Sequence, residues 1–160
     1  HDTALPAAQL AAVARPGDAP GSAIIGITIP DGFTGDVDLH LQSPQALWKQ
    51  RTTVACDAIG YQREWQSHGT GKLEDYGQDT LKLPATPKGQ TYVLRYTIEH
   101  QVKAGAPWQP NAVRKVQTAT TRPNGDIVWL LDSEDGGDRD YDDTRLQLTV
   151  KKDVPAVLAE

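Results

Sequence analysis

The chain has 160 residues, of which 23% are charged and 38% are hydrophobic, the balance of one soluble globular domain large enough to bury a core. Its formal net charge is −5, and seven of its 21 acidic residues lie within residues 132–143, so the acidity is local. This charge, together with the lack of a Lys/Arg cluster in the sequence, excludes nucleic acid as a natural partner. No run of about 18 apolar residues occurs, which excludes insertion into a membrane.

The N-terminal part of the chain differs in composition from the rest. Residues 1–20 are rich in Ala and interrupted by Pro and Gly, which is typical of an N-terminal arm or linker. A short, poorly capped helix over residues 7–14 is the alternative. From Ser22 onward apolar residues recur at every second position, which predicts strands.

Five segments show the strand pattern clearly, and three shorter ones are weaker candidates. The clear segments are residues 23–29, 36–41, 91–99, 126–132 and 144–150, and the shorter ones are residues 52–56, 80–83 and 113–118. Fourteen Gly and eleven Pro separate these runs. Roughly seven to nine short strands with regular turns predict an all-β fold, an antiparallel β-sandwich. We expect the sandwich to cover residues 21–150, followed by a C-terminal extension over residues 151–160.

The aromatic residues and the single cysteine fall into two groups. Trp129 lies inside an apolar strand and Cys56 ends another, so both are expected in the core. Trp48, Trp65 and Trp108 lie near predicted turns. There they would pack at the rim of the sandwich or stack on a sugar ring.

The most informative segment is residues 134–143, in which six of the ten residues are carboxylates and Arg139 is the only cation. So many like charges in one short loop repel each other unless a cation neutralises them. Ca²⁺ takes six to eight oxygen ligands and is the natural candidate. The segment joins the predicted strands 126–132 and 144–150, which places a calcium-binding loop at one end of the sandwich. The alternative is a solvated acidic turn that binds nothing.

Other metal sites fit the pattern less well. An EF-hand that began at Asp138 would need Gly at position 143 and Glu at position 149, where the chain has Asp and Thr. Zinc would need Cys or a close His pair, and Mg²⁺ seldom uses an all-protein cage. Two Ca²⁺ ions would balance most of the five negative charges of the predicted ligands. These ligands are Glu134, Asp138, Asp140, Asp142 and Asp143.

The stretch from Leu131 to Asp143 resembles the calcium loop of the LecB-like family of small bacterial fucose- and mannose-binding lectins. Residues 67–72 and 92–110 resemble the family more weakly. The resemblance implies a nine-stranded sandwich with two adjacent calcium ions, which sugar hydroxyls coordinate directly. It implies that four carboxylates bind the ions and that Asp142 stands where the family usually has Asn. The four are Glu134, Asp138, Asp140 and Asp143.

The same resemblance assigns the sugar-binding residues. Asp135 would contact the sugar, and Gly137 would lie in the region that sets sugar preference. Gly136 and Asp31 complete the predicted sugar-binding set, because the family's early loop corresponds to residues 29–34, where Asp31 is the obvious oxygen donor. Tyr141 would point into the sandwich.

These observations predict a calcium-dependent lectin that is not an enzyme and that binds mannose- or fucose-type sugars. We expect it to be secreted or on the cell surface, where free Ca²⁺ is plentiful, and a homodimer is among the assemblies that the family implies. The alternative is a structural calcium module of an adhesin or assembly protein, which the altered early loop and the C-terminal extension favour. An enzyme ranks third: His1 with His40, His68 and His100 could hold copper in the manner of polysaccharide oxygenases.

Overall fold

The computed structural model describes residues 10–13, 22–84, 90–113, 119–134 and 143–153. Among these residues, nine strands have four residues or more and three have two. The longer strands are β1 (Leu10–Val13), β2 (Ser22–Thr28), β3 (Phe33–Ser43), β4 (Lys49–Cys56), β5 (Tyr61–Gln66), β6 (Glu74–Lys82), β7 (Thr91–Gln101), β11 (Ile127–Glu134) and β12 (Thr144–Lys152). The short ones are β8 (Gln109–Pro110), β9 (Ala112–Val113) and β10 (Thr120–Thr121), and a 3₁₀ turn covers Asp57–Ile59.

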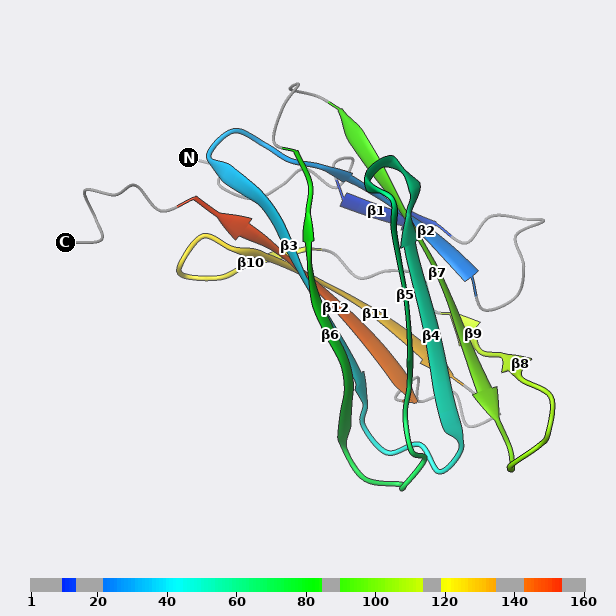
Figure 1. Ribbon diagram of the computed structural model, residues 1–160. Helices are drawn as coiled ribbons and strands as arrows, with labels where there is room; N and C mark the ends of the chain where they lie inside the picture. The colour runs from blue at the N-terminus through cyan, green and yellow to red at the C-terminus, as the bar shows by residue number, and fades with distance from the viewer. Residues whose placement is uncertain (1–9, 14–21, 85–89, 114–118, 135–142, 154–160) are drawn as a thin grey trace.

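The strands form two antiparallel sheets that face each other (Figure 1). Sheet A has the order β1-β2-β7-β4-β5, with β8 paired to β7. Sheet B has the order β10-β11-β12-β3-β6, with β9 paired to β11. This confirms the predicted all-β antiparallel sandwich. No helix in the described part of the chain is long and apolar enough to cross a membrane.

The core follows from the period-two pattern of the strands. In β3, Val37, Leu39 and Leu41 are at most 1% exposed, while the residues between them face outward. Residues of β2, β7 and β12 alternate in the same way and meet the β3 side chains between the sheets. Trp129 and Cys56 are each 1% exposed, as predicted. Burying one face of every strand is what fixes the register of both sheets.

Several element boundaries differ from those predicted. Residues 10–13 form β1, paired with β2 from Leu10↔Ile27 to Val13↔Ile24, so the alternative of a helix over residues 7–14 is wrong there. β5 was not predicted, because as an edge strand it carries mostly exposed polar side chains. β12 continues to Lys152, into the predicted C-terminal extension. Of the predicted strand 113–118, only Val113 lies within the described residues.

The long strand β3 defines the two ends of the sandwich. Its first residue, Phe33, is paired with Lys152 of β12, and its last, Ser43, with Glu74 of β6. Its 11 residues span about 35 Å at the usual rise per residue. We call these the Phe33 end and the Ser43 end. Segment 134–143 begins and finishes at the Ser43 end. Thr144 is paired with Ser133, and the next residue, Arg145, is paired with Gln42, the last residue but one of β3.

Candidate functional site

The acidic segment is attached at both ends to buried strands, through Ser133 of β11 and Thr144 of β12, which we call its two feet. The Asp143 amide donates to the Ser133 carbonyl at 3.2 Å, which closes the hairpin. The Ser43 hydroxyl of the neighbouring strand donates to the Asp143 carbonyl at 2.7 Å. Ser133 and Thr144 are fully buried, and Asp143 is only 7% exposed. The segment therefore starts and ends on backbone that the sandwich holds in place.

The structure describes only part of the predicted site. Asp143 lies at the foot of the segment, and Glu134 lies at the end of β11, where its backbone is paired with Ala112. The Glu134 side chain and six further predicted residues lie outside what the structure describes. These are Asp135, Gly136, Gly137, Asp138, Asp140 and Asp142. Tyr141 lies outside it as well.

Asp31 is not brought to this end. It is an exposed residue of the turn between β2 and β3, at the Phe33 end, so the length of β3 separates it from Asp143. A single site cannot include both residues within one chain. The prediction that Asp31 joins the sugar-binding set of the acidic segment is corrected by this placement. The correspondence of residues 29–34 to the family's early loop was made by position along the chain, which does not show at which end of the sandwich a loop lies.

Asp132, just before the acidic segment, forms an ion pair with Arg145. The Asp132 carboxylate accepts a hydrogen bond from Arg145 Nε at 2.7 Å across the β11–β12 pair, and Asp132 is 5% exposed. A carboxylate so nearly buried needs a cation beside it. Asp132 therefore stabilises the hairpin below the acidic segment.

A cluster of polar side chains without a carboxylate is buried where the acidic segment begins and ends, at Ser133 and Thr144. Gln50 Oε1 accepts hydrogen bonds from Asn111 Nδ2 at 2.8 Å and from Thr144 Oγ1 at 3.0 Å. Asn111 Nδ2 also donates to Ser133 Oγ at 3.1 Å, and Asn111 Oδ1 lies 2.7 Å from His100 Nδ1. We call this group the buried polar cluster. Its members are Gln50, Thr52, Tyr76, His100, Asn111, Ser133 and Thr144.

The buried polar cluster joins the two sheets. Gln50 and Thr52 come from β4 of sheet A, whereas Ser133 and Thr144 come from β11 and β12 of sheet B. The Tyr76 hydroxyl of β6 bridges Thr52 Oγ1 at 2.8 Å and Thr144 Oγ1 at 3.0 Å. Burial raises the pKa of Tyr76 to about 12, and the two hydrogen bonds only partly oppose this rise, so the phenol stays neutral.

Sequence reasoning missed this cluster, although the pattern contains a signal for it. In β4, Gln50 and Thr52 occupy the same inward-facing positions as Val54 and Cys56, and all four are buried. Polar residues at inward positions of a strand are expected to find hydrogen-bond partners, because an unpaired buried polar group is costly. The pattern shows which residues need partners but not which partners they have.

Aromatic side chains lie near the cluster at the Ser43 end. The Trp48 ring is 36% exposed and stacks on the buried His100 ring, with 5.1 Å between centroids and 18° between planes. Trp108 is half-buried under the Arg51 guanidinium, 4.3 Å from the ring centroid, and Arg51 is paired with Glu99. The half-buried Trp65 packs against the core. Trp48 is thus the most exposed of these three tryptophans.

The metal prediction rests on residues that are mostly outside the described ranges. Within those ranges, no three His, Cys, Asp or Glu side chains gather into a group that could hold a metal ion. The three described histidines lie apart: His40 pairs with Asp75, His68 with Glu74 and His100 with Asn111. The ligands predicted for segment 134–143 are all carboxylates, a set of oxygen donors that fits Ca²⁺ and not a soft metal.

The fold is shared with bacterial lectins of known structure. The chain is 15% identical to the C-terminal domain of the lectin BC2L-C from Burkholderia cenocepacia, with a TM-score of 0.51, covering 82% of this chain and 95% of that one. It is 16% identical to the Chromobacterium violaceum lectin CV2L, solved with α-methyl-fucoside, with a TM-score of 0.52 and coverage of 82% and 96%. It is 19% identical to the high-affinity mannose-binding lectin of Ralstonia solanacearum, with a TM-score of 0.50, covering 78% of this chain and 93% of that one.

No protein-family model matches the sequence, and no curated protein matches it. The three lectin structures confirm, at the level of the fold, the resemblance to the fucose- and mannose-binding lectins that residues 131–143 indicated.

Proposed function

We propose that the protein is a carbohydrate-binding lectin without catalytic activity, and that it binds sugar at the Ser43 end. Two observations support this. The sandwich has the fold of bacterial lectins whose structures include a complex with α-methyl-fucoside and a high-affinity mannose-binding protein. The segment with the highest density of carboxylates is placed at one end of that sandwich, where loops on a rigid scaffold commonly carry function.

The binding is proposed to depend on calcium. Five carboxylates would hold two Ca²⁺ ions, namely those of Glu134, Asp138, Asp140, Asp142 and Asp143. Bound Ca²⁺ would supply open coordination positions that vicinal sugar hydroxyls can fill. Asp135, Gly136 and Gly137 would contact the sugar. A homodimer and a secreted or cell-surface location remain predictions.

The observation that carries this proposal is the anchoring of the acidic segment. Ser133 and Thr144, its two feet, are hydrogen-bonded into the buried polar cluster, and Ser43 holds the backbone of Asp143. A binding loop whose supporting residues are locked by packing and hydrogen bonds loses less conformational entropy when it binds an ion or ligand. The cluster contains no carboxylate, so it adds no negative charge next to the ends of the segment.

Trp48 supports sugar binding at the same end. Its ring is accessible and is held flat by His100, which is itself hydrogen-bonded to Asn111 of the cluster. An aromatic face presents a suitable surface to the C–H groups of a pyranose ring. We propose that Trp48 contacts the parts of a glycan that extend beyond the residue bound at the acidic segment.

A structural calcium module of an adhesin or assembly protein is the second candidate. It is favoured by the placement of Asp31, because the early loop that should add an oxygen donor to the sugar site lies at the opposite end. Titration of α-methyl-mannoside and α-methyl-fucoside into calcium-loaded protein separates the two candidates. Heat of binding supports the lectin, whereas its absence at millimolar sugar supports the module.

The calcium proposal is tested by isothermal titration of CaCl₂ into the metal-free protein, the D143N variant and the D31N variant. D143N is expected to weaken calcium binding about tenfold or more, because it removes one anionic ligand, while D31N should bind like the unaltered chain. D140N repeats the test three positions earlier in the sequence, in case D143N lowers stability. The proposal fails if the unaltered protein binds no Ca²⁺ at millimolar concentration.

A further inference from the structure

The outer face of sheet B presents a regular grid of polar side chains. Two rows cross the middle of three neighbouring strands. In one row Thr149 of β12, Asp38 of β3 and Thr80 of β6 are register partners. In the next row the partners are Gln147, His40 and Gln78. This face lies opposite the core-facing side of the same strands, so none of these residues belongs to the apolar core.

A groove of about 330 Å³ lies over these two rows. Its lining consists of the six row residues together with Asp79, Arg122 and the β3 residue Leu39. Pockets for small ligands start at about this volume. The groove shares no residue with the acidic segment.

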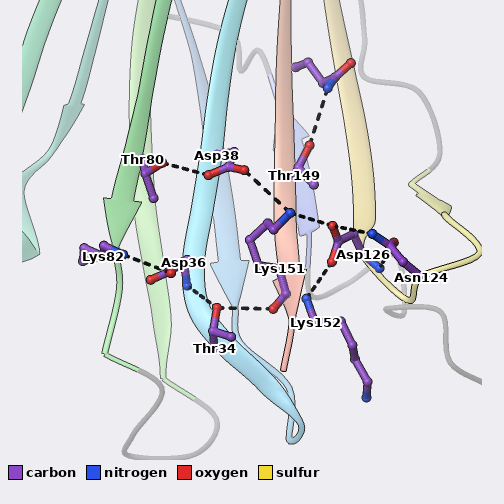
Figure 2. A network of polar contacts seen from close by, with 11 residues as sticks. Thr34, Asp36, Asp38, Thr80, Lys82, Asn124, Asp126, Thr149, Lys151 and Lys152 are labelled. Carbon is purple, nitrogen blue, oxygen red and sulfur yellow. Dashed lines mark hydrogen bonds and ion pairs between the residues drawn. The ribbon is translucent and has the colours of Figure 1, made fainter. Parts of the chain in front are cut away.

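The side chains of the groove are held in position by their neighbours. Thr80 Oγ1 donates to Asp38 Oδ1 at 2.8 Å, and Asp38 Oδ2 faces Lys151 Nζ at 3.8 Å. Lys151 Nζ in turn donates to Asp126 Oδ2 at 2.8 Å (Figure 2). We call this set the charged network. Its members are Thr34, Asp36, Asp38, Thr80, Lys82, Asn124, Asp126, Lys151 and Lys152.

Both carboxylates that line the groove already have partners within the protein. Asp38 faces Lys151, and Asp79 accepts a hydrogen bond from the Tyr61 hydroxyl at 2.7 Å and lies 3.5 Å from Arg63. The hydrogen bond from Tyr61 is the main reason why the pKa of Asp79 is lowered, so this carboxylate stays ionised. The lining carries two carboxylates and one guanidinium, that of Arg122, so the groove has no excess of positive charge to attract an anionic ligand. The existing partners of the two carboxylates leave little for a cationic ligand to gain.

What the lining offers is a mixture of donors and acceptors. Gln78 and Gln147 each present an amide, and Thr80 and Asp38 keep acceptor lone pairs beyond the hydrogen bond between them. Thr149 also lines the groove but is only 3% exposed. Sugar hydroxyls act as both donors and acceptors, so a neutral glycan matches this lining without introducing an unpaired charge.

We propose that the groove between His40 and Thr80 on the outer face of sheet B is a second glycan-binding site, which takes a neutral oligosaccharide by hydrogen bonding without calcium. It goes beyond the proposed function, because the ligand class follows from the lining of the groove and not from the acidic segment. Binding is expected to be weak, in the millimolar range, because no tryptophan, tyrosine or phenylalanine ring lines the groove.

The test records NMR spectra of the ¹⁵N-labelled protein in EDTA, which removes Ca²⁺ and so prevents calcium-dependent binding. Mannotriose and cellotriose are the neutral probes, a heparin-derived disaccharide is the anionic probe and spermidine the cationic one. We expect one of the neutral probes to shift the side-chain amide signals of Gln78 and Gln147. The Q78A/Q147A variant should bind that probe about tenfold or more weakly, because it removes the two amides that hydrogen-bond the sugar.

The matched control is Q62A, which removes an exposed glutamine from β5 of sheet A. It should bind as the unaltered protein does, and equal melting temperatures of the variants show that folding is intact. The proposal is overturned if neither neutral probe shifts the groove signals, or if the heparin disaccharide or spermidine binds there more tightly. Groove binding in EDTA without any calcium binding at segment 134–143 would overturn the proposed function and leave the second site standing.

Discussion

The sandwich contains two polar networks of opposite character. The buried polar cluster at the Ser43 end lies between the sheets and consists of amides, hydroxyls and an imidazole, with Gln50 and Thr144 fully buried. The charged network towards the Phe33 end lies on the outer face of sheet B, and its ion pairs reach water, as in Lys82–Asp36, where the side chains are 74% and 34% exposed. The cluster joins two sheets, whereas the network joins strands of one sheet and the turn beside it.

The difference follows from the dielectric environment. Between the sheets an ion would lose its hydration, so neutral groups that satisfy one another are the stable solution. On the outer face charges keep most of their hydration, and their mutual attraction is weak. Asp126 is the intermediate case: it is 3% exposed, yet it accepts hydrogen bonds from Lys151 Nζ, the Lys152 amide and Asn124.

The largest expected effect comes from breaking the buried polar cluster at its centre. N111A should lower the free energy of unfolding by about 3 kcal/mol, because Gln50, His100 and Ser133 each lose a partner while remaining buried. N124A is the matched change in the charged network, and because Asn124 is exposed it should cost only about 1 kcal/mol. Urea denaturation measures both. Equal losses would contradict the comparison.

The second prediction concerns Asp126 and acid. Burial alone would raise the pKa of this carboxyl, but hydrogen bonds from Lys151 and the Lys152 amide outweigh it and lower the pKa in the folded protein. The unfolded chain therefore binds the proton more readily, so the stabilisation is present above about pH 4 and is lost as the pH falls through the folded value.

D126N should cost about 2 kcal/mol at pH 7, because it removes the charge beside Lys151 and an acceptor. It should also flatten the loss of stability below about pH 4. Melting curves from pH 7 to pH 2 provide the measurement, with the more exposed Asp36 as the D36N control. An unchanged acid slope in D126N would show that other carboxylates set it.

Two buried tyrosines sharpen the contrast between the cluster and the apolar core. The Tyr76 hydroxyl has two hydrogen-bond partners, whereas the Tyr96 hydroxyl is buried and makes no hydrogen bond within the described structure. Y76F should cost about 1.5 kcal/mol, since Thr52 and Thr144 lose a shared partner. Y96F should be neutral or slightly stabilising, because it removes a desolvated polar group. Thermal and urea unfolding of both variants would reveal a reversed order.

The smallest effect is expected at the edge of the charged network. K82A removes the ion pair with Asp36, which has an N–O distance of 3.0 Å but lies largely in water. The free energy of unfolding should change by no more than about 0.5 kcal/mol, and 1 M NaCl should abolish the difference. A loss comparable to that of D126N would mean that the outer face stabilises the fold more than its exposure suggests.

Much of the fold was predictable from local pattern. The alternation in residues 36–41 and 144–150 correctly predicted strands with an apolar inner face, and Trp129 was correctly placed in the core. β1 and β5 were not predicted. β1 is Ala-rich and is held by backbone pairing with β2, which any residue except Pro can make. β5 is an edge strand in which only Tyr61 and Trp65 pack against the core while the other four side chains are exposed.

The candidate site was predictable only in part. The sequence showed that residues 134–143 form an acidic connection between two strands, and the structure gives that connection two buried feet at Ser133 and Thr144. It could not show that Asp31 lies at the other end of β3, because a local motif contains no information on which end of a strand meets which loop.

The sequence by itself determined which face of each strand is buried and where the carboxylates concentrate, since both are properties of neighbouring residues. The tertiary structure decided which distant residues meet: Gln50 with Thr144 across the sheets, and Asp126 with Lys151 on the outer face. Side-chain alternation determines toward which face of the sheet a side chain points. The order of the strands determines which residues of other strands it contacts. That order is set by backbone pairing and burial over the whole domain.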